Sequence, residues 1–103
     1  MTKVILESPY AGEVARNIEY AKLCMKDSLM RNESPLVSHL LLTQVLNDTI
    51  PSERTLGINA GLAWLDVADK HVFYVDYGWS KGMNWAAKTA ADMGKEIEIR
   101  RIL

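Results

Sequence analysis

Four short apolar segments alternate along this chain with segments of helical periodicity, and this alternation restricts the fold more than any other feature. The apolar segments cover residues 3–8, 35–38, 71–76 and 95–103. The third is the strongest strand candidate because it is aromatic and β-branched, while the last alternates apolar and charged residues, as half-exposed edge strands do. Helical crossovers between strands favour parallel neighbours. The order predicts an α/β fold, a three-layer sandwich around a mostly parallel sheet of four or five strands.

Two of the intervening segments carry the spacing of amphipathic helices. In residues 13–31, apolar residues recur every three or four positions, at Val14, Ile18, Ala21, Met25 and Leu29. Residues 53–66 repeat the pattern at Leu56, Ala60, Ala63 and Trp64, with Gly57 and Gly61 one turn apart. A glycine inside a helix costs about 1 kcal/mol relative to alanine. The glycine pair therefore predicts that a neighbouring backbone or a ligand approaches this helix closely.

A third helix is expected between Ser80, a good N-cap residue, and Gly94, which suits the left-handed position after a helix. Its inner face should comprise Met83, Ala86, Ala87 and Ala90. Residues 40–46 are apolar without a clear period, so we predict that they are irregular or weakly helical.

Length and charge narrow the class of protein. The 103 residues fit a single domain, 1–103, whose thin core favours a homo-oligomer, a dimer or larger. The net charge of -1 argues against a nucleic-acid polymer as partner. No apolar stretch reaches bilayer length and no signal-peptide pattern follows Met1, so we expect a cytoplasmic protein without membrane contact.

Cysteine content and motif content exclude several chemistries. Cys24 is the only cysteine, which rules out an internal disulfide and a multi-thiolate metal site, and we predict that it fills the core. Phosphate-binding loops, dinucleotide-binding glycine motifs and zinc-protease motifs do not occur. We therefore expect neither a metal nor a cofactor.

Candidate site residues follow the strands, because ligands of parallel sheets collect beyond the carboxyl ends of the strands. The first turn after a strand comprises Ser8, Pro9, Tyr10, Ala11 and Gly12. It opens a helix whose free N–H groups favour an anionic or polar ligand group, and Tyr10 adds an aromatic face. The alternative is an ordinary turn in which Tyr10 caps the sheet.

The segment after the third strand is the second candidate. Gly78 and Gly82 allow close approach of the backbone, Ser80 opens a helix, and Tyr77 and Trp79 can stack on a planar base. The alternative for Trp79 is a lid on the sheet edge or a subunit contact.

Histidines and loop charges complete the candidates. His39 follows the second strand and can bond a ribose or phosphate, or act as an acid or base near neutral pH. His71 begins the third strand, so we expect it at the opposite end of the sheet in a structural role. Charges near Pro51 can close over a ligand, although solvated loop charges are the more common outcome; they are Asp48, Glu53 and Arg54.

The order of these segments resembles the nucleoside 2-deoxyribosyltransferase-like superfamily. The matching elements are the turn at residues 8–12, Asn17 on the helix after it, residues 35–39, Asp76 and residues 78–83. The chain is more closely similar to a small bacterial and phage family of that superfamily, of the DUF4406 or DUF7768 kind. The resemblance implies a flavodoxin- or Rossmann-like sheet, a cleft over the strand ends, and oligomers whose neighbours complete each cleft.

The resemblance also implies a lost nucleophile. Transferases of this superfamily use a glutamate one helical turn beyond the glycine of a short segment that aligns with residues 80–82, and here that position is Ala86. A pocket that keeps its binding groups without this carboxylate is expected to hold a nucleoside or nucleotide without consuming it. An NAD-derived signalling nucleotide, sequestered by a phage protein acting as an anti-defence sponge, is one such ligand.

The expected function is therefore non-catalytic nucleoside or nucleotide binding. The expected ligand-binding residues are Ser8, Pro9, Tyr10, Ala11, Gly12, Asn17, Ser38, His39, Asp76, Gly78, Trp79, Ser80, Gly82 and Met83. One alternative is an N-glycosidic-bond hydrolase or deoxyribosyltransferase that uses Glu7 or Asp76. Another is an oligomeric interaction module with a vestigial cleft, whose surface comprises Tyr77, Trp79 and Trp85.

Overall fold

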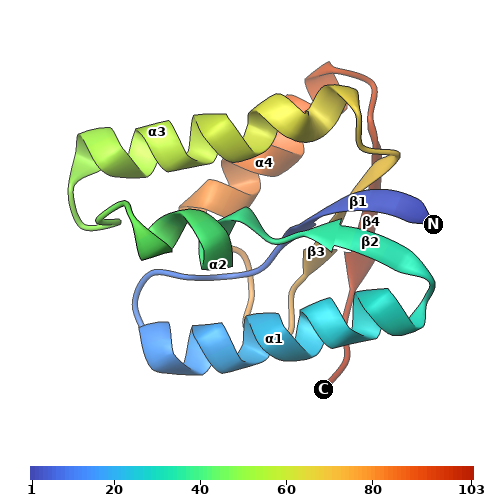
Figure 1. The fold of residues 1–103 in the computed structure, drawn as a ribbon, viewed down its shortest axis with the longest axis horizontal. Coiled ribbons are helices and arrows are strands. Elements are labelled where there is room, and N and C mark those ends of the chain that lie inside the picture. Colours follow the sequence, from blue (N-terminus) through green and yellow to red (C-terminus); the bar gives the residue numbers. More distant parts are fainter.

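A computed structural model describes residues 1–103 and has a four-stranded sheet at its centre (Figure 1). The strands are β1 (Thr2–Glu7), β2 (Glu33–Leu36), β3 (Lys70–Tyr74) and β4 (Glu96–Arg100). Their order across the sheet is β2-β1-β3-β4, and every neighbouring pair is parallel. The predicted α/β fold is confirmed, with four strands and no antiparallel member.

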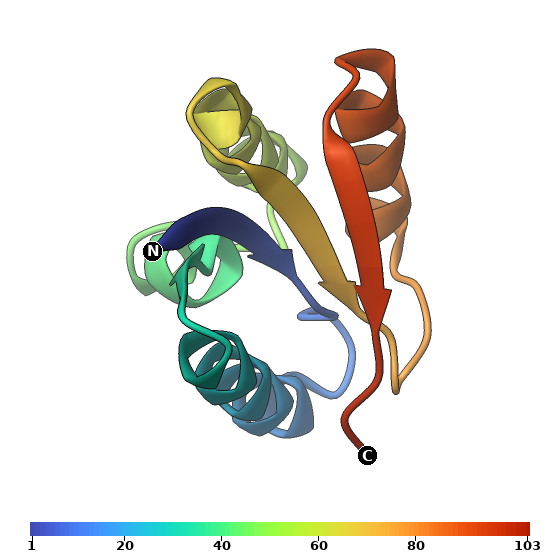
Figure 2. The same cartoon turned by 90° about the vertical axis from the view of Figure 1, so that its right-hand side faces the viewer.

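Helices cover both faces of the sheet (Figure 2). The chain contains α1 (Val14–Met30), α2 (Ser38–Leu41), α3 (Pro51–Leu62) and α4 (Lys81–Asp92), with short 3₁₀ turns η1 (Leu42–Gln44) and η2 (Ala63–Asp66). α1 lies on one face, while α3 and α4 lie on the other. This arrangement is the expected Rossmann- or flavodoxin-like three-layer sandwich. None of the helices has the length and apolar composition needed to cross a membrane.

The core divides into two layers because side chains alternate along each strand. On the α1 side, Val4, Leu6 and Tyr74 pack with Tyr20 and Cys24. The Cys24 side chain is fully buried, as predicted, and burial raises the pKa of its thiol to about 12.

On the opposite side, the core is formed with α3, η2 and α4. Ile5 packs with Leu65, and Phe73 packs with Met83 of α4. The inner face predicted for α4 is correct at Met83, Ala86 and Ala90, all of which are buried.

The buried face of α1 differs from the predicted stripe. Val14 and Leu29 are 38% and 49% exposed, respectively. The buried residues of the helix are Asn17, Tyr20, Ala21, Cys24 and Ser28. Polar members of this face have partners, since the Ser28 hydroxyl donates to Glu33 Oε1 at 2.7 Å. Apolar periodicity missed this face because hydrogen-bonded polar residues complete it.

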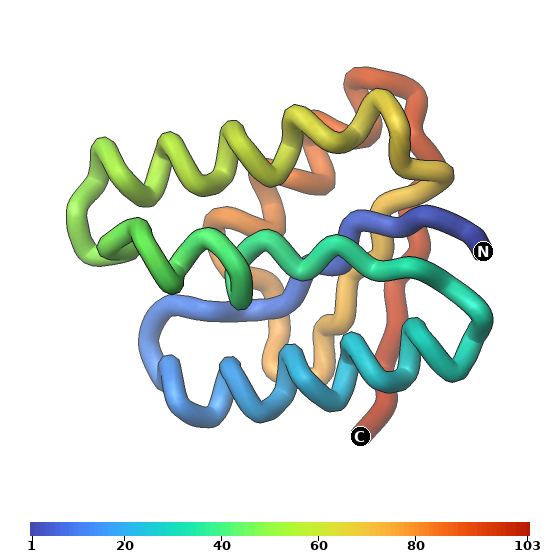
Figure 3. Tube along the Cα trace, viewed as in Figure 1, coloured from blue at the N-terminus to red at the C-terminus, as the bar shows by residue number.

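α3 is also rotated relative to its predicted face. Leu56 and Trp64 are largely exposed, whereas Gly61 and Leu65 are buried. α2 and η1 lead away from the sheet and α3 returns beside them (Figure 3). A Cβ at Gly61 would lie 2.6 Å from Ser38 Oγ, and one at Gly57 would lie 3.3 Å from Leu46 Cδ1. The predicted close approach is therefore made by the preceding helical segment.

Several predicted boundaries need correction. β2 begins at Glu33 and includes Pro35, because an edge strand with one neighbour tolerates a missing N–H. β3 ends at Tyr74, which leaves Asp76 beyond the strand. Residues 38–44 are helical in two short pieces, and Ser80 and Gly94 delimit α4 as predicted, with φ of 69° at Gly94.

Candidate functional site

A cavity of about 90 Å³ opens at the carboxyl end of β1, between α2, α3 and α4. This is the edge of the sheet where ligands of parallel folds are expected. Its lining comprises Glu7, Ser8, Tyr10, Ala11, Ser38, His39, Leu42, Thr43, Leu46, Asp48, Glu53, Arg54, Gly57, Ile58, Leu62, Ser80, Gly82, Met83 and Ala86.

A carboxylate and a buried histidine meet at the sheet end of the cavity. Glu7 is the last residue of β1, and its Oε1 lies 3.2 Å from Nε2 of His71. The His71 ring is fully buried and stacks on Phe73 at a centroid distance of 4.6 Å. Its Nδ1 has no partner. His71 itself does not line the cavity, but its contact with Glu7 joins it to the site more closely than its expected place at the opposite end of the sheet.

A second histidine pairs with the turn after β1. His39 Nε2 lies 2.7 Å from Ser8 Oγ, and its buried Nδ1 is without a partner. Burial lowers the pKa of His39, although the negative charge of Glu7 acts in the opposite direction. Burial therefore favours the neutral ring, in which one nitrogen is a donor and the other an acceptor.

The start of α4 forms one wall of the cavity. The Ser80 hydroxyl accepts the N–H of Met83 at 3.1 Å, which fixes the first turn of the helix. Gly82, Met83 and Ala86 face the cavity from this wall. Ala86 contributes only a methyl group, so α4 supplies no carboxylate.

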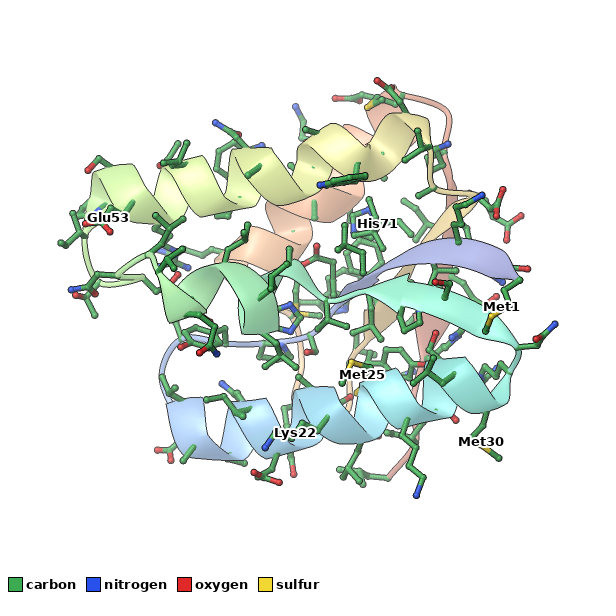
Figure 4. All side chains as sticks on the ribbon, in the orientation of Figure 1. Met1, Lys22, Met25, Met30, Glu53 and His71 are labelled. Carbon is green, nitrogen blue, oxygen red and sulfur yellow. The ribbon has the colours of Figure 1, made fainter.

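The far end of the cavity carries charged residues. Glu53 lies at the end of α3 that points away from the sheet, far from His71 (Figure 4). Its carboxylate accepts the N–H of Asn47 at 2.9 Å. Arg54 and Asp48 line the same cavity.

Comparison with protein-family models gives a match over nearly the whole chain. The model of the domain of unknown function DUF7768 covers residues 2–100. The chain belongs to the DUF7768 family. Curated proteins and solved structures gave no match. The family match includes every residue of the cavity lining, so the site lies entirely within the DUF7768 domain.

The cavity of this DUF7768 protein brings together part of the predicted set. The predicted residues that line it are Ser8, Tyr10, Ala11, Ser38, His39, Ser80, Gly82 and Met83, and the alternative catalytic residue Glu7 joins them. Those outside the lining are Pro9, Gly12, Asn17, Asp76, Gly78 and Trp79. Asn17 still supports the site, because its Nδ2 donates to the carbonyls of Tyr10 and Ala11 at 3.0 and 3.1 Å.

Asp76 is occupied by contacts within the DUF7768 domain. It accepts from the Tyr20 hydroxyl at 2.6 Å and from the backbone N–H groups of Ile102 and Leu103 at 2.9 to 3.2 Å. Burial alone would raise the pKa of Asp76, but these hydrogen bonds outweigh burial and lower it. Both carboxylate oxygens thus anchor the C-terminal tail.

Trp79 also has a partner outside the cavity. Its ring lies 5.2 Å from that of Phe73 and is 40% exposed. Tyr77 packs against Tyr20 at 4.7 Å, with the Arg16 guanidinium 4.1 Å from its centroid. Both rings are partly exposed, but Tyr77 packs on the α1 side of the sheet and Trp79 packs on the side of Phe73 and α4.

The lining contains residues that the sequence did not suggest as site residues. They are Leu42, Thr43, Leu46, Ile58 and Leu62. Apolar helical residues are indistinguishable from core in sequence. Only the glycine pair signalled a close approach on this wall.

Proposed function

We propose that the cavity binds a nucleoside or nucleotide and leaves its glycosidic bond intact. Ala86 carries this proposal, because the α4 wall presents a methyl group where the superfamily resemblance implies the nucleophilic carboxylate. Hydrogen-bonding groups for a sugar remain beside it, in Glu7, Ser8 and His39. Such a site recognises the ligand without supplying a group on α4 that attacks the anomeric carbon.

The size of the cavity suggests which part of the ligand lies inside it and which part lies at its opening. Pockets for whole drug-sized ligands measure about 300–1,000 Å³, and this one encloses about 90 Å³. A furanose ring suits the enclosed part, while the base lies over Tyr10 at the opening. A neighbouring subunit of a homo-oligomer, as the resemblance implies, would cover the base.

A narrower form of the proposal names the ligand. The resemblance to the nucleoside 2-deoxyribosyltransferase-like superfamily suggests an NAD-derived signalling nucleotide, sequestered in the cytoplasm by a phage protein. Its support is the resemblance of the strand-end segments.

The test is recovery of intact ligand. Native mass spectrometry of freshly purified protein should show subunit stoichiometry and a co-purifying mass of nucleotide size. Incubation with nucleosides, nucleotides and NAD-derived cyclic nucleotides, followed by heat denaturation, should release the bound molecule unchanged. Release of free base and sugar would overturn the proposal, and so would absence of binding across this panel.

A second candidate function is N-glycoside hydrolysis, favoured by the position of Glu7. Its carboxylate lies in the cavity beside His71 Nε2. As general base, Glu7 would take a proton from water while the water oxygen bonds the anomeric carbon; the C–N bond breaks and the base leaves with a proton from solvent. Base release that Glu7→Gln abolishes and Asp76→Asn retains would establish this function over binding alone.

A third candidate is an interaction surface. Tyr77, Trp79 and Trp85 are each about two-fifths exposed, at 42%, 40% and 42%. If Trp79→Ala changes the oligomeric mass while small-molecule thermal shifts are unaffected or absent, the surface carries the function instead of the cavity.

A further inference from the structure

Two arginines of the chain are at least half-buried, Arg54 and Arg100. The Arg100 guanidinium bonds Glu33, Glu98 and Tyr74, whereas the Arg54 guanidinium has no partner within the chain. No hydrogen bond or ion pair involves the Arg54 side chain, although it lines the cavity. The N–H donors of this half-buried guanidinium are therefore not used within the chain and are free to bond a ligand. An anionic ligand in the cavity would supply the acceptor.

The two ends of the cavity differ in chemistry. At the sheet end, the Glu7 carboxylate accepts hydrogen bonds and suits donor groups such as sugar hydroxyls. Arg54 lies in the first turn of α3, at the end that points away from the sheet. Its planar fork of N–H donors matches a phosphate group. A ligand that spans both ends therefore carries hydroxyls at one end and an anion at the other.

We propose that the ligand is a nucleoside 5′-monophosphate, with its ribose hydroxyls toward Glu7 and its phosphate on Arg54. This inference rests on the proposed binding function. The 2′ and 3′ hydroxyls and the 5′ carbon leave opposite sides of the furanose ring, so hydroxyls at Glu7 direct a 5′ substituent toward Arg54. The base then remains over Tyr10, which lines the cavity from the β1–α1 turn.

Two carboxylates limit the number of phosphates. Asp48 and Glu53 line the cavity near Arg54, and Glu53 is held by the Asn47 N–H. One phosphate can pair with the single arginine, whereas each further phosphate adds negative charge without another cation in the lining. The site should therefore prefer a monophosphate over the corresponding triphosphate.

The experiment compares affinities by isothermal titration calorimetry. The probes are adenosine, guanosine, cytidine and uridine, each with its 5′-monophosphate and 5′-triphosphate. The wild-type protein should bind at least one monophosphate about tenfold or more tightly than its nucleoside, since charge-assisted bidentate bonds are strong. In Arg54→Gln this ratio should fall to near one. In Asp48→Asn it should rise, because a repulsive charge is removed.

Arg101→Gln is the matched control, since Arg101 is exposed and lies outside the lining. It should keep the wild-type ratio, and thermal melting should show that all variants are folded. Nucleoside binding without a phosphate preference, or a preference that survives Arg54→Gln, would overturn this inference and leave the proposed function standing. Absence of binding by all probes would overturn both.

Discussion

Glu7 and Asp76 both lie just beyond buried strand residues, yet their carboxylates have different neighbours. Asp76 accepts from the Tyr20 hydroxyl and two backbone N–H groups, so its lone pairs are used within the fold. The Glu7 carboxylate has one polar partner, Nε2 of His71, and lines the cavity. Of the two carboxylates considered for chemistry, Glu7 alone is placed to meet a ligand.

Asp76→Asn should therefore weaken the fold and leave the site intact. The amide keeps the shape but presents N–H groups where Tyr20 and Leu103 also donate. We expect a loss of about 1–2 kcal/mol in the free energy of unfolding, because hydrogen bonds to a charged but half-exposed acceptor are weakened. Urea denaturation measures this loss, and calorimetry should show unchanged ligand affinity. A large drop in affinity of the folded variant would instead make Asp76 a ligand residue.

At the scale of elements, periodicity located the strands and helices but not all of their faces. β3 and α4 were predictable because an aromatic, β-branched run and a Ser80 cap are local signals. The buried face of α1 was not, because Ser28 depends on Glu33 for its hydrogen bond. Residue patterns cannot reveal a polar side chain whose partner lies on another element.

The candidate site divides in the same way. The turn after β1 and the start of α4 were predictable because strand ends and helix caps have recognisable residues. Trp79 and Asp76 are residue types that often bind ligands. Here Trp79 packs on Phe73, and Asp76 bonds the C-terminal tail. On the α3 wall, Glu53 and Arg54 were candidates from the sequence, whereas Ile58 and Leu62 were missed because apolar helical residues resemble core.

The contact between α2 and α3 gives a prediction at this scale. Gly61→Ala places a methyl group 2.6 Å from Ser38 Oγ and 3.0 Å from Ser38 Cβ, so the Ser38 side chain must turn away and the two helices must shift apart slightly. We expect a net loss of about 1–3 kcal/mol, despite the higher helix propensity of alanine. Gly57→Ala is the control, because its Cβ would meet the flexible end of Leu46 at 3.3 Å. Thermal and urea unfolding compare the two, and equal stability would contradict the close approach at Gly61.

Across the whole molecule, an ion cluster joins the two edge strands. Arg100 of β4 donates to both carboxylate oxygens of Glu33 at the start of β2, at 2.6 and 2.8 Å. Lys70 of β3 lies between them, 3.4 Å from Glu33 and 2.9 Å from Glu98. The cluster therefore connects strands that come from distant segments of the chain.

This cluster predicts a loss of stability in acid. Hydrogen bonds from Arg100 lower the pKa of Glu33 to about 2, from an ordinary value of 4.5. A carboxyl with a depressed pKa stabilises the fold fully above its unfolded value, and that contribution disappears as pH falls from about 4.5 to 2. The contribution is at most about 3 kcal/mol.

Urea denaturation at pH 7, 5 and 3 measures this dependence. Glu33→Gln should be less stable at pH 7 and should lose less stability between pH 5 and 3. Glu19→Gln is the control, because Glu19 pairs with Lys22 on the surface, where an ion pair contributes little. Equal acid slopes in wild type and Glu33→Gln would show that the cluster does not govern acid unfolding.

The parallel order of the strands also determines how the chain reaches this structure. Thr2 pairs with Glu33, and Val4 pairs with Lys70, so no two neighbouring strands are joined by a hairpin. Each pair of strands can form only after a long segment of chain has closed into a loop. This closure costs conformational entropy before the strands make any contact. Helices can form early in such a chain, but the sheet that shapes the cavity is completed late, and folding is slower than in a helical bundle of this length.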